Sequence, residues 1–463
     1  MNPDSVLRCN VRQTLCRAFI ERYRDLLSCF KSILKQSLSE TQVTDFKFLH
    51  VADIHLDSPL LGLARYEGVP VDEVRSATRT ALTNLVDLAI EEEVAFVVIA
   101  GDIYDGDWPH FGTGLFFCAA MGRLEKAGIE VFLLYGNHDA ESVLTKKLPL
   151  PPNVHTFPSN KAKTLVHQTT GTVLHGRSYK VKDTRDNLAV DYPQATAGAF
   201  NIGVLHTALN GGRPPHVAYA PCSLAELAAK GYQYWALGHV HEFDIVSDSP
   251  YVVFPGNLQG RSVRECGPKG AVIVTVRDQE VAFVPQHFPL DSVRWAHIEV
   301  DATDVTNETE LHSRIRDLLE TAVDTESAGR ALVARITLTG ATGLHGWLTE
   351  TKDQLQNDIR GIAVSISESL WIEKISLKTD ALAQVSASGS IVLDELSGLL
   401  AAGLESPELG FKLKGDLADF IGRLPSDLGS DDEMLACVRR GEQQPLLESA
   451  TTALIARLES GAK

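Results

Sequence analysis

Five apolar, strand-like runs in this chain each end in side chains that bind metals. The runs are FKFLHVADIHLD (46–57), AFVVIAGDIYD (95–105), EVFLLYGNHD (130–139), FNIGVLHT (200–207) and YQYWALGHVH (232–241). Their endings form the ordered series D-x-H, G-D, G-N-H-D, H and G-H-x-H. One such pair could arise by chance, but an ordered series of five could hardly do so. The series therefore predicts one site assembled from five separate segments.

The runs also predict the kind of sheet that carries the site. Near-continuous apolar runs are typical of central strands covered by helices on both faces, or of strands inside a sandwich. Ligands at the carboxyl ends of such strands match the place where α/β sheets hold their sites. We therefore expect the five endings to meet at one edge of the fold.

Local geometry should bring the ligands together. Residues two apart in an extended chain point the same way, so we expect Asp53 with His55, and His239 with His241, to approach a metal from one side. A glycine without a Cβ permits a sharp turn or a close backbone approach. Three glycines stand just before ligands: Gly101, Gly136 and Gly238.

The donor types indicate which metals the site would take. The series offers carboxylate, amide and imidazole groups and no cysteine. Such a set favours divalent ions such as Mn²⁺, Fe²⁺, Mg²⁺ or Zn²⁺ over soft metals and clusters. Manganese is our first expectation.

The ordered motifs resemble those of the calcineurin-like metallophosphoesterase superfamily. The segments HVADIHLDSP, GDIYDGDWP, GNHD, LGHVH and FPGNLQGR are similar to its DNA-repair exonuclease branch, the SbcD/YhaO-like nucleases. The similarity runs from Phe46 to near Phe288 and is weaker beyond. It implies an α/β protein with a calcineurin-like metallophosphoesterase β-sandwich flanked by helices, a small α/β capping domain and a helical C-terminal region.

The resemblance also implies a binuclear metal centre. One metal would be held by Asp53, His55 and His241, the other by Asn137, His206 and His239, and Asp102 would bridge both. His138 would be an acid that protonates the leaving group or stabilises the transition state, and Asp105 would orient its ring.

The chain is long enough for two to three domains at 463 residues. We expect an N-terminal extension at 1–45, a metallophosphoesterase (nuclease) domain at 46–289, a capping α/β domain at 290–380 and a helical C-terminal region at 381–463. Alternating strand and helix patterns in the capping domain make a split βαβ unit one candidate. The basic extension fits a transit peptide, a misassigned start or an amphipathic helix.

Charge and cysteine content limit how the protein could hold DNA and in which compartment it could work. A net charge of −17 argues against a broad basic face for DNA, so we expect DNA to be held locally or by a partner. Seven cysteines without C-x-x-C spacing indicate a reducing compartment. No apolar stretch approaches the ~18 residues of a membrane span. A soluble, cytoplasmic protein without membrane contact is expected.

Three functions fit these observations. The first is a metal-dependent DNA exonuclease or endonuclease acting in DNA repair. The second is a metallophosphoesterase acting on a nucleotide, a phosphoprotein or another small phosphoester, although GDIYDGD and GNHDA lack the arginines and glutamate of the phosphoprotein branch. The third is a non-catalytic scaffold, against which the intact ligand set argues.

Partners follow from the same resemblance. The C-terminal helices would either pack on their own domain or dock an ATPase subunit of the SbcC/YhaN type. The family pattern also implies a homodimer formed through helices of the nuclease domain.

Overall fold

The computed structural model describes residues 45–58, 71–106, 111–141, 148–209 and 219–382, with isolated positions beyond 382. The extension expected at 1–45 and the helical region expected at 381–463 thus lie almost wholly outside the described residues. The chain divides into two compact units. Of the described residues, the first unit holds 45–58, 75–259 with its gaps, and 268–291, and the second is mainly 260–267 and 292–382.

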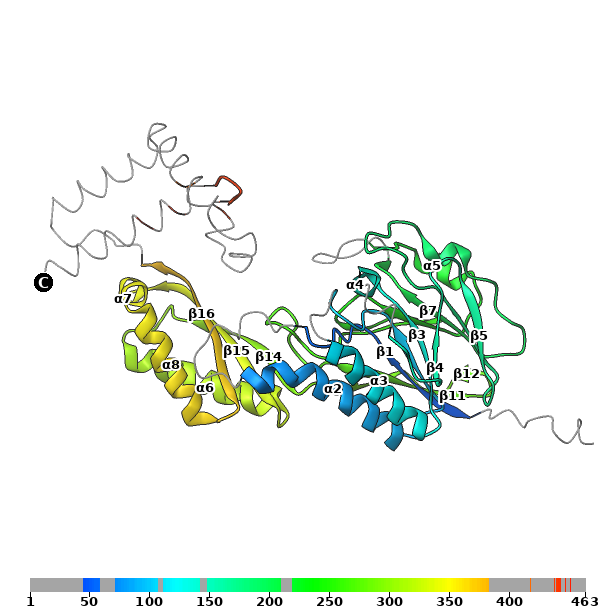
Figure 1. The fold of residues 1–463 in the computed structure, drawn as a ribbon. Coiled ribbons are helices and arrows are strands. Elements are labelled where there is room, and N and C mark those ends of the chain that lie inside the picture. Colours follow the sequence, from blue (N-terminus) through cyan, green and yellow to red (C-terminus); the bar gives the residue numbers. More distant parts are fainter. Residues whose placement is uncertain are drawn as a thin grey trace, which may run out of the picture. The chain divides into compact units, whose positions relative to one another are not determined.

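The first unit is a sandwich of two sheets (Figure 1). One sheet has the order β12-β11-β1-β2-β3-β4, with β13 also paired to β11. Strands β1 to β4 are parallel, and β11 is antiparallel to β1. Their bounds are β1 Phe46–Val51, β2 Phe96–Ala100, β3 Glu130–Leu134, β4 Val154–Thr156, β11 Gly270–Arg277, β12 Glu280–Val281 and β13 Gln286–Pro289.

The second sheet has the order β5-β6-β7-β8-β10-β9. Its central strands β6, β7, β8 and β10 are parallel, and β5 and β9 are antiparallel edges. The bounds are β5 Lys163–His167, β6 Thr172–Gly176, β7 Asn201–His206, β8 Tyr234–Gly238, β9 Phe243–Asp248 and β10 Tyr251–Pro255. The five runs predicted from sequence are therefore β1, β2, β3, β7 and β8.

Aromatic rings fill the space between the sheets. Phe48 stacks on Phe96 at 5.2 Å between centroids, and Tyr234 meets Phe48 edge-on at 5.3 Å. The outer face of the first sheet is covered by α2 (Val71–Glu91) and α3 (Phe111–Lys126). Part of the second is covered by α5 (Leu224–Ala228) and the short helix η3 (Leu188–Asp191). The predicted sandwich flanked by helices is confirmed.

The segment after β11 is an interrupted strand. From the apolar residues at 271–276 and 280–286 the sequence predicts a hairpin with a continuous second strand, whereas the structure has the two-residue β12 and then β13. Pro285 lies in the break, and proline cannot donate to a sheet ladder. The intervening Phe283 and Val284 are exposed.

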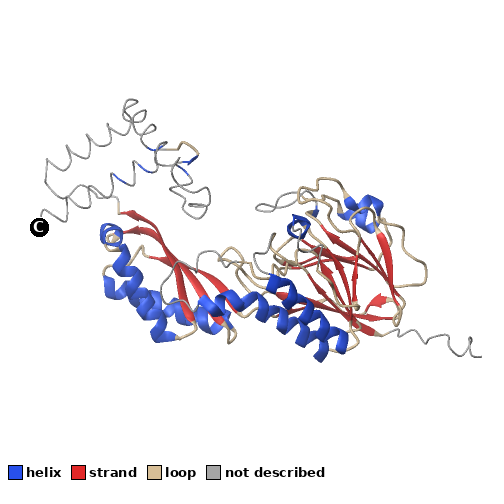
Figure 2. Cartoon of the chain, in the orientation of Figure 1, coloured by secondary structure: helices blue, strands red, loops and turns tan. Residues whose placement is uncertain are grey.

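The second unit is a three-stranded parallel sheet in the order β14-β15-β16. Helices pack against one face of it (Figure 2). The elements are β14 Val293–Asp301, α6 Glu308–Ala322, η5 Val323–Ser327, β15 Ala331–Thr342, α7 His345–Glu350, α8 Lys352–Ile366 and β16 Leu370–Ala381. The predicted α/β character is present.

The split βαβ arrangement is wrong for this sheet. Each helical crossover returns the chain to the adjacent position, so successive strands are neighbours with no strand between them. The sequence also has an apolar run at 362–366 that suggests a separate segment, but in the structure this run is the end of α8, where Leu355, Ile359 and Ala363 continue one helical face. No helix among the described residues is long and apolar enough to cross a membrane.

Candidate metal centre

The predicted ligands lie at strand ends or just beyond them, and four of them have an uncommon backbone conformation. Asp53, His55 and Asp102 have φ angles of 50°, 44° and 52°, and His239 has 103°. Non-glycine residues seldom have such φ angles, and the backbone strain that these angles carry is common at functional sites. We expected the two residues of each D-x-H and H-x-H pair to point the same way because the chain is extended, but the backbone at these ligands is not extended. Positive φ angles at Asp53 and His55 accompany the approach of that pair, whereas His239 lies beside His206 and His241 beside Asp53 and His55.

Backbone hydrogen bonds tie the first two ligand loops to each other. The Asp53 amide donates to the Gly101 carbonyl at 3.0 Å, and the His55 amide donates to the Asp102 carbonyl at 3.1 Å. The Asp53 carboxylate in turn accepts from the His239 amide at 2.8 Å. Three separate segments are thus held in one arrangement by bonds that do not depend on a metal.

Glycines make this arrangement sterically possible. A Cβ at Gly136 would lie 2.2 Å from Asp102 Oδ1, and one at Gly238 would lie 2.2 Å from the Ala100 carbonyl oxygen. Gly101 has a φ of +98°, which glycine adopts at no steric cost. Glycine is therefore required before the ligands, as predicted. At Gly136 and Gly238 a Cβ would clash with a neighbour, and at Gly101 the φ is positive.

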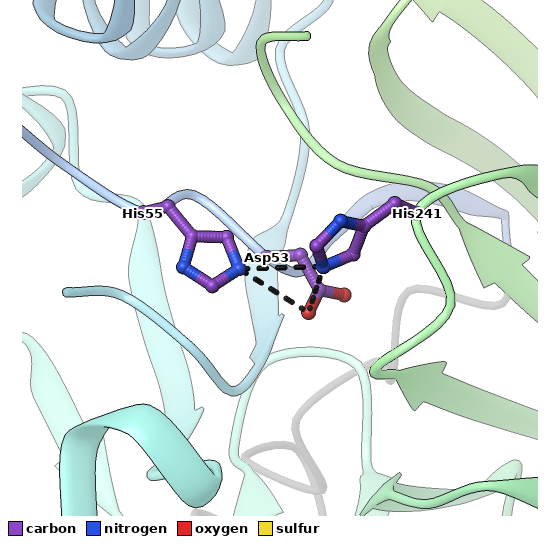
Figure 3. A group of neighbouring side chains, drawn as sticks. All are labelled: Asp53, His55 and His241. Carbon is purple, nitrogen blue, oxygen red and sulfur yellow. Dashed lines mark hydrogen bonds and ion pairs between the residues drawn. The ribbon is translucent and has the colours of Figure 1, made fainter. Parts of the chain in front are cut away.

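Asp53, His55 and His241 form the first ligand group (Figure 3). Asp53 Oδ1 lies 3.9 Å from His55 Nε2 and 3.5 Å from His241 Nε2, and the two Nε2 atoms are 3.4 Å apart. Asp53 Oδ1 is buried and accepts no hydrogen bond. A buried carboxylate oxygen without a hydrogen bond, facing two imidazole nitrogens, fits a divalent cation.

A second group surrounds His206. Its Nε2 lies 2.9 Å from Asn137 Oδ1 and 3.4 Å from Asp102 Oδ2, and its ring centroid is 5.3 Å from that of His239. His206 Nδ1 bonds the Ala100 carbonyl at 2.9 Å. Because a carbonyl can only accept, Nδ1 carries the proton and Nε2 is the nitrogen turned toward the site.

Asp102 lies between the two groups. Its Oδ2 is 3.4 Å from His206 Nε2 and 4.0 Å from His55 Nε2. Asp53 also falls in both groups of potential ligands. The structure therefore brings all seven predicted ligands together and puts Asp102 where a bridging carboxylate would lie.

The buried charges of the site shift one another's pKa values. Burial alone would raise the pKa of Asp53, but the adjacent imidazole of His241 and the nearby His206 lower that pKa to about 2. Burial likewise opposes ionisation of Asp102, yet the neighbouring histidines hold its pKa well below the ordinary range. Against its own burial, the carboxylate of Asp102 raises the pKa of His206 to about 9. The site thus concentrates negative charge that attracts protons, and metal binding would displace them.

His138 and Asp105 form a pair beside the two groups. His138, on α4 (Asn137–Glu141), has its Nδ1 2.8 Å from Asp105 Oδ1. Ser58 Oγ donates to the other Asp105 oxygen at 2.8 Å. The His138 ring is about one-third exposed, so it can be reached from solvent. The predicted contact between these two residues is present.

Comparison with known proteins identifies the domain that carries the site. Residues 46–243 match the model of the calcineurin-like phosphoesterase family. The chain contains a calcineurin-like metallophosphoesterase domain. It is accordingly a metal-dependent phosphoester hydrolase, and a dimetal centre is the one its family implies.

Further matches extend over most of the phosphoesterase. Residues 295–380 match a model described as the middle domain of the metallophosphoesterase YhaO. The chain is 28% identical over 400 residues to the uncharacterized metallophosphoesterase YhaO of Bacillus subtilis (strain 168), covering 85% of this chain and 95% of that protein.

Two solved structures are also similar. The protein TT1561 of Thermus thermophilus matches with a TM-score of 0.30 and 12% identity, over 53% of this chain and 99% of that one. A dimetal phosphatase from Danio rerio matches with a TM-score of 0.30 and 12% identity, over 50% and 93%.

Asp139 is a supporting residue of the phosphoesterase that sequence reasoning missed. Its carboxylate accepts from the amides of Ile103, Tyr104 and Gly136 at 2.9 to 3.2 Å. Burial, and then repulsion from Asp102, raise the pKa of Asp139 to about 7. Asp139 therefore joins the loop after β2 to the loop after β3. The available signal was the carboxylate that closes the G-N-H-D motif.

Asp57 supports the first ligand loop from the other side. It accepts two hydrogen bonds from Arg79 on α2, both at 2.6 Å, and one from Thr113 on α3 at 2.6 Å. Its own φ is 60°. This carboxylate anchors the D-x-H loop to both covering helices, and such long-range contacts leave no local sequence signal.

Two other polar side chains have structural partners. His175 is buried, bonds Thr164 and Asn201, and stacks on Tyr232 at 4.6 Å. Arg261 pairs with Glu265 at 3.2 Å.

Proposed function

We propose that this phosphoesterase is a metal-dependent DNA exonuclease or endonuclease that hydrolyses phosphodiester bonds in DNA repair. The observation that carries the proposal is the pair of loops around His138. The G-D-I-Y-D-G-D loop has Gly106 and Asp107 where phosphoprotein phosphatases carry arginine and glycine, and the G-N-H-D loop ends in Asp139, not glutamate. The segments around both loops resemble the exonuclease branch.

His138 would act as the acid in this reaction. When bound, two divalent ions supply an activated water and charge stabilisation for in-line displacement at phosphorus. His138 Nδ1 is turned toward Asp105 at 2.8 Å, so Nε2 would be the atom that delivers a proton to the leaving oxygen. Asp105 holds the ring in that orientation and is itself held by Ser58.

Manganese is the metal we propose. The site offers carboxylate oxygens, one amide oxygen and imidazole nitrogens, and no thiolate within the described ligand groups. A set of this kind suits intermediate to hard divalent ions. Fe²⁺, Mg²⁺ and Zn²⁺ are the other ions that the same donors accept.

An ATPase partner would explain how an acidic protein handles long DNA. The net charge of −17 leaves little basic surface for the phosphate backbone. We propose that a subunit of the SbcC/YhaN type supplies it and docks on the C-terminal region at 391–463, most of which lies outside the described residues. A homodimer is also part of the proposal.

A second candidate is hydrolysis of a nucleotide or another small phosphoester. The same net charge favours it, since a small substrate needs only the metal centre and no extended basic surface. A non-catalytic scaffold is less well supported, because a scaffold has no chemical need for the His138–Asp105 pair beside a complete ligand set.

One assay separates the candidates. The purified protein with Mn²⁺ is incubated with labelled single-stranded, blunt and hairpin DNA, beside bis-p-nitrophenyl phosphate and a phosphopeptide, and His138→Ala serves as the matched control. We expect DNA and the small phosphodiester to be cut, and both activities to fall in the variant. Hydrolysis of the small phosphodiester without any DNA cleavage would favour the second candidate.

A further inference from the structure

A cavity of about 530 Å³ lies against the helix that carries Asn137 and His138. Its lining comes from the end of β3, from α4, from the segment around β4 and from the segment after β6. This volume is within the range of pockets that bind small molecules. On α4 the lining residues are Asp139 and Ala140, whereas Asn137 and His138 contact the metal-site residues. The cavity is therefore a neighbour of the reaction site and not the site itself.

The described lining favours an uncharged ligand with apolar surface. Apolar walls come from Leu148, Leu150 and Phe157. Tyr135 also lines the cavity, and its hydroxyl makes no hydrogen bond to any described residue. Among the described lining residues there is no lysine, arginine or histidine, and Asp139 is the one acidic group. Among these described residues a phosphate or carboxylate would find no cationic partner, so this part of the lining disfavours anions.

From this lining we infer that the cavity binds an uncharged nucleobase, with an apolar wall against its face and the Tyr135 hydroxyl at its polar edge. The choice of a nucleobase among flat heterocycles rests on the proposed action on DNA. The base could come from a free nucleoside or from an unpaired position of the bound strand. Both sources present the same planar, hydrogen-bonding chemistry.

Three lining residues connect the cavity to the ligand loops. Tyr135 directly precedes Gly136 and Asn137. Tyr179, also in the lining, donates its hydroxyl to the carbonyl oxygen of His206 at 2.9 Å and meets that ring edge-on at 5.6 Å. Asp139 holds the amides after β2. An occupant would therefore touch residues that position ligands from β2, β3 and β7.

The test is calorimetric titration of the full-length, metal-loaded protein with deoxyadenosine, which carries no phosphate to bind the metals. Thr156 lines the cavity and is exposed, so Thr156→Trp fills the space without opening the core. Tyr135→Phe keeps the shape and removes the hydroxyl. Asn160→Trp, exposed and outside the lining, is the matched control.

We expect saturable binding in the wild type and in Asn160→Trp, none in Thr156→Trp, and affinity about fivefold weaker in Tyr135→Phe, the effect of one neutral hydrogen bond. Absence of saturable binding, or binding unchanged in Thr156→Trp, overturns the inference. Hydrolysis of bis-p-nitrophenyl phosphate and of DNA is measured separately on the same samples. A failure of the proposed nuclease activity is thereby distinguished from a failure of nucleobase binding.

A second titration distinguishes the two sources of the base. A single strand containing 2-aminopurine is bound to the slow variant His138→Ala, and its fluorescence is followed as deoxyadenosine is added. Displacement by deoxyadenosine that disappears in Thr156→Trp assigns the cavity to a base of the strand. Binding of deoxyadenosine without displacement assigns it to a free nucleoside.

Discussion

His206 shows how a single residue gains its role from its surroundings. The sequence places a histidine after an apolar strand, and such a residue alone is commonly structural. In the fold, the Ala100 carbonyl fixes which nitrogen carries the proton, while Asn137 and Asp102 lie at the other nitrogen. The place of His206 in the ligand set could be predicted from the ordered motifs. The tautomer of its ring could not be predicted, because Ala100 is 106 residues away in the sequence.

At the same scale, His138 should be needed for chemistry and not for metal binding. Its side chain bonds Asp105 and meets the ring of the ligand His55 edge-on at 5.0 Å, and its backbone amide donates to Asp102 at 3.0 Å. His138→Ala keeps that amide, so turnover should fall by ~10²–10⁴-fold with metal content unchanged. The measurement is kcat on bis-p-nitrophenyl phosphate beside metal analysis of the same preparation. Loss of metal in this variant would place His138 among the ligands.

Among elements, the turns after β2 and β3 set the geometry. A methyl group at Gly136 would lie 2.2 Å from Asp102 Oδ1, so Gly136→Ala should displace the carboxylate and reduce metal content and activity together. Gly122, within α3, has no atom within 4 Å of a built Cβ. Gly122→Ala is the control and should keep full activity while stabilising the helix by about 1 kcal/mol. Equal activity in both variants would contradict the steric argument.

Strand β1 contributes a pH dependence of stability through His50. Its ring bonds the Tyr234 hydroxyl at 3.0 Å and the Leu237 carbonyl at 3.1 Å, and burial lowers the pKa of His50 to about 3 from 6.5. Below pH 6.5 the unfolded chain binds a proton that the folded chain rejects. The part of the free energy of unfolding that depends on a neutral His50 is therefore fully present above pH 6.5. It decreases by about 1.4 kcal/mol per pH unit as the pH falls toward 3.

The matched variant for this prediction is His50→Gln, which keeps a donor and an acceptor but cannot titrate. Denaturant unfolding is measured at pH 7 and pH 5 for both proteins. We expect the wild type to lose more stability than the variant over this interval. Parallel losses would show that His50 is not the titrating group.

Elements were predicted better than the turns between them. The apolar runs predict β1, β2, β3, β7 and β8 because burial on both faces leaves a local signal. The left-handed backbone at Asp53, His55 and Asp102 has no such signal, since even Asp and His, which are enriched there among non-glycine residues, adopt it uncommonly. The anchoring of Asp57 by Arg79 and Thr113 depends on helices that are distant in sequence.

For the whole molecule, the net charge of −17 limits how DNA is held. With few phosphates neutralised, few counterions are released, so the plot of log affinity against log salt should have a slope of about −2 or shallower.

Deleting residues 391–463 should leave hydrolysis of a small phosphodiester nearly unchanged and abolish partner-dependent processing of duplex DNA. If small-substrate activity is lost together with cooperative unfolding, the C-terminal region is core structure and the docking proposal fails.

Metal analysis of the purified protein tests the binuclear centre most directly. Asp102 Oδ2 lies between His206 and His55, which belong to different ligand groups, so Asp102→Ala should remove more metal than loss of the terminal ligand in His55→Ala. We predict two ions per chain in the wild type, fewer in His55→Ala and fewest in Asp102→Ala. Two ions per chain retained in Asp102→Ala would contradict the bridging role.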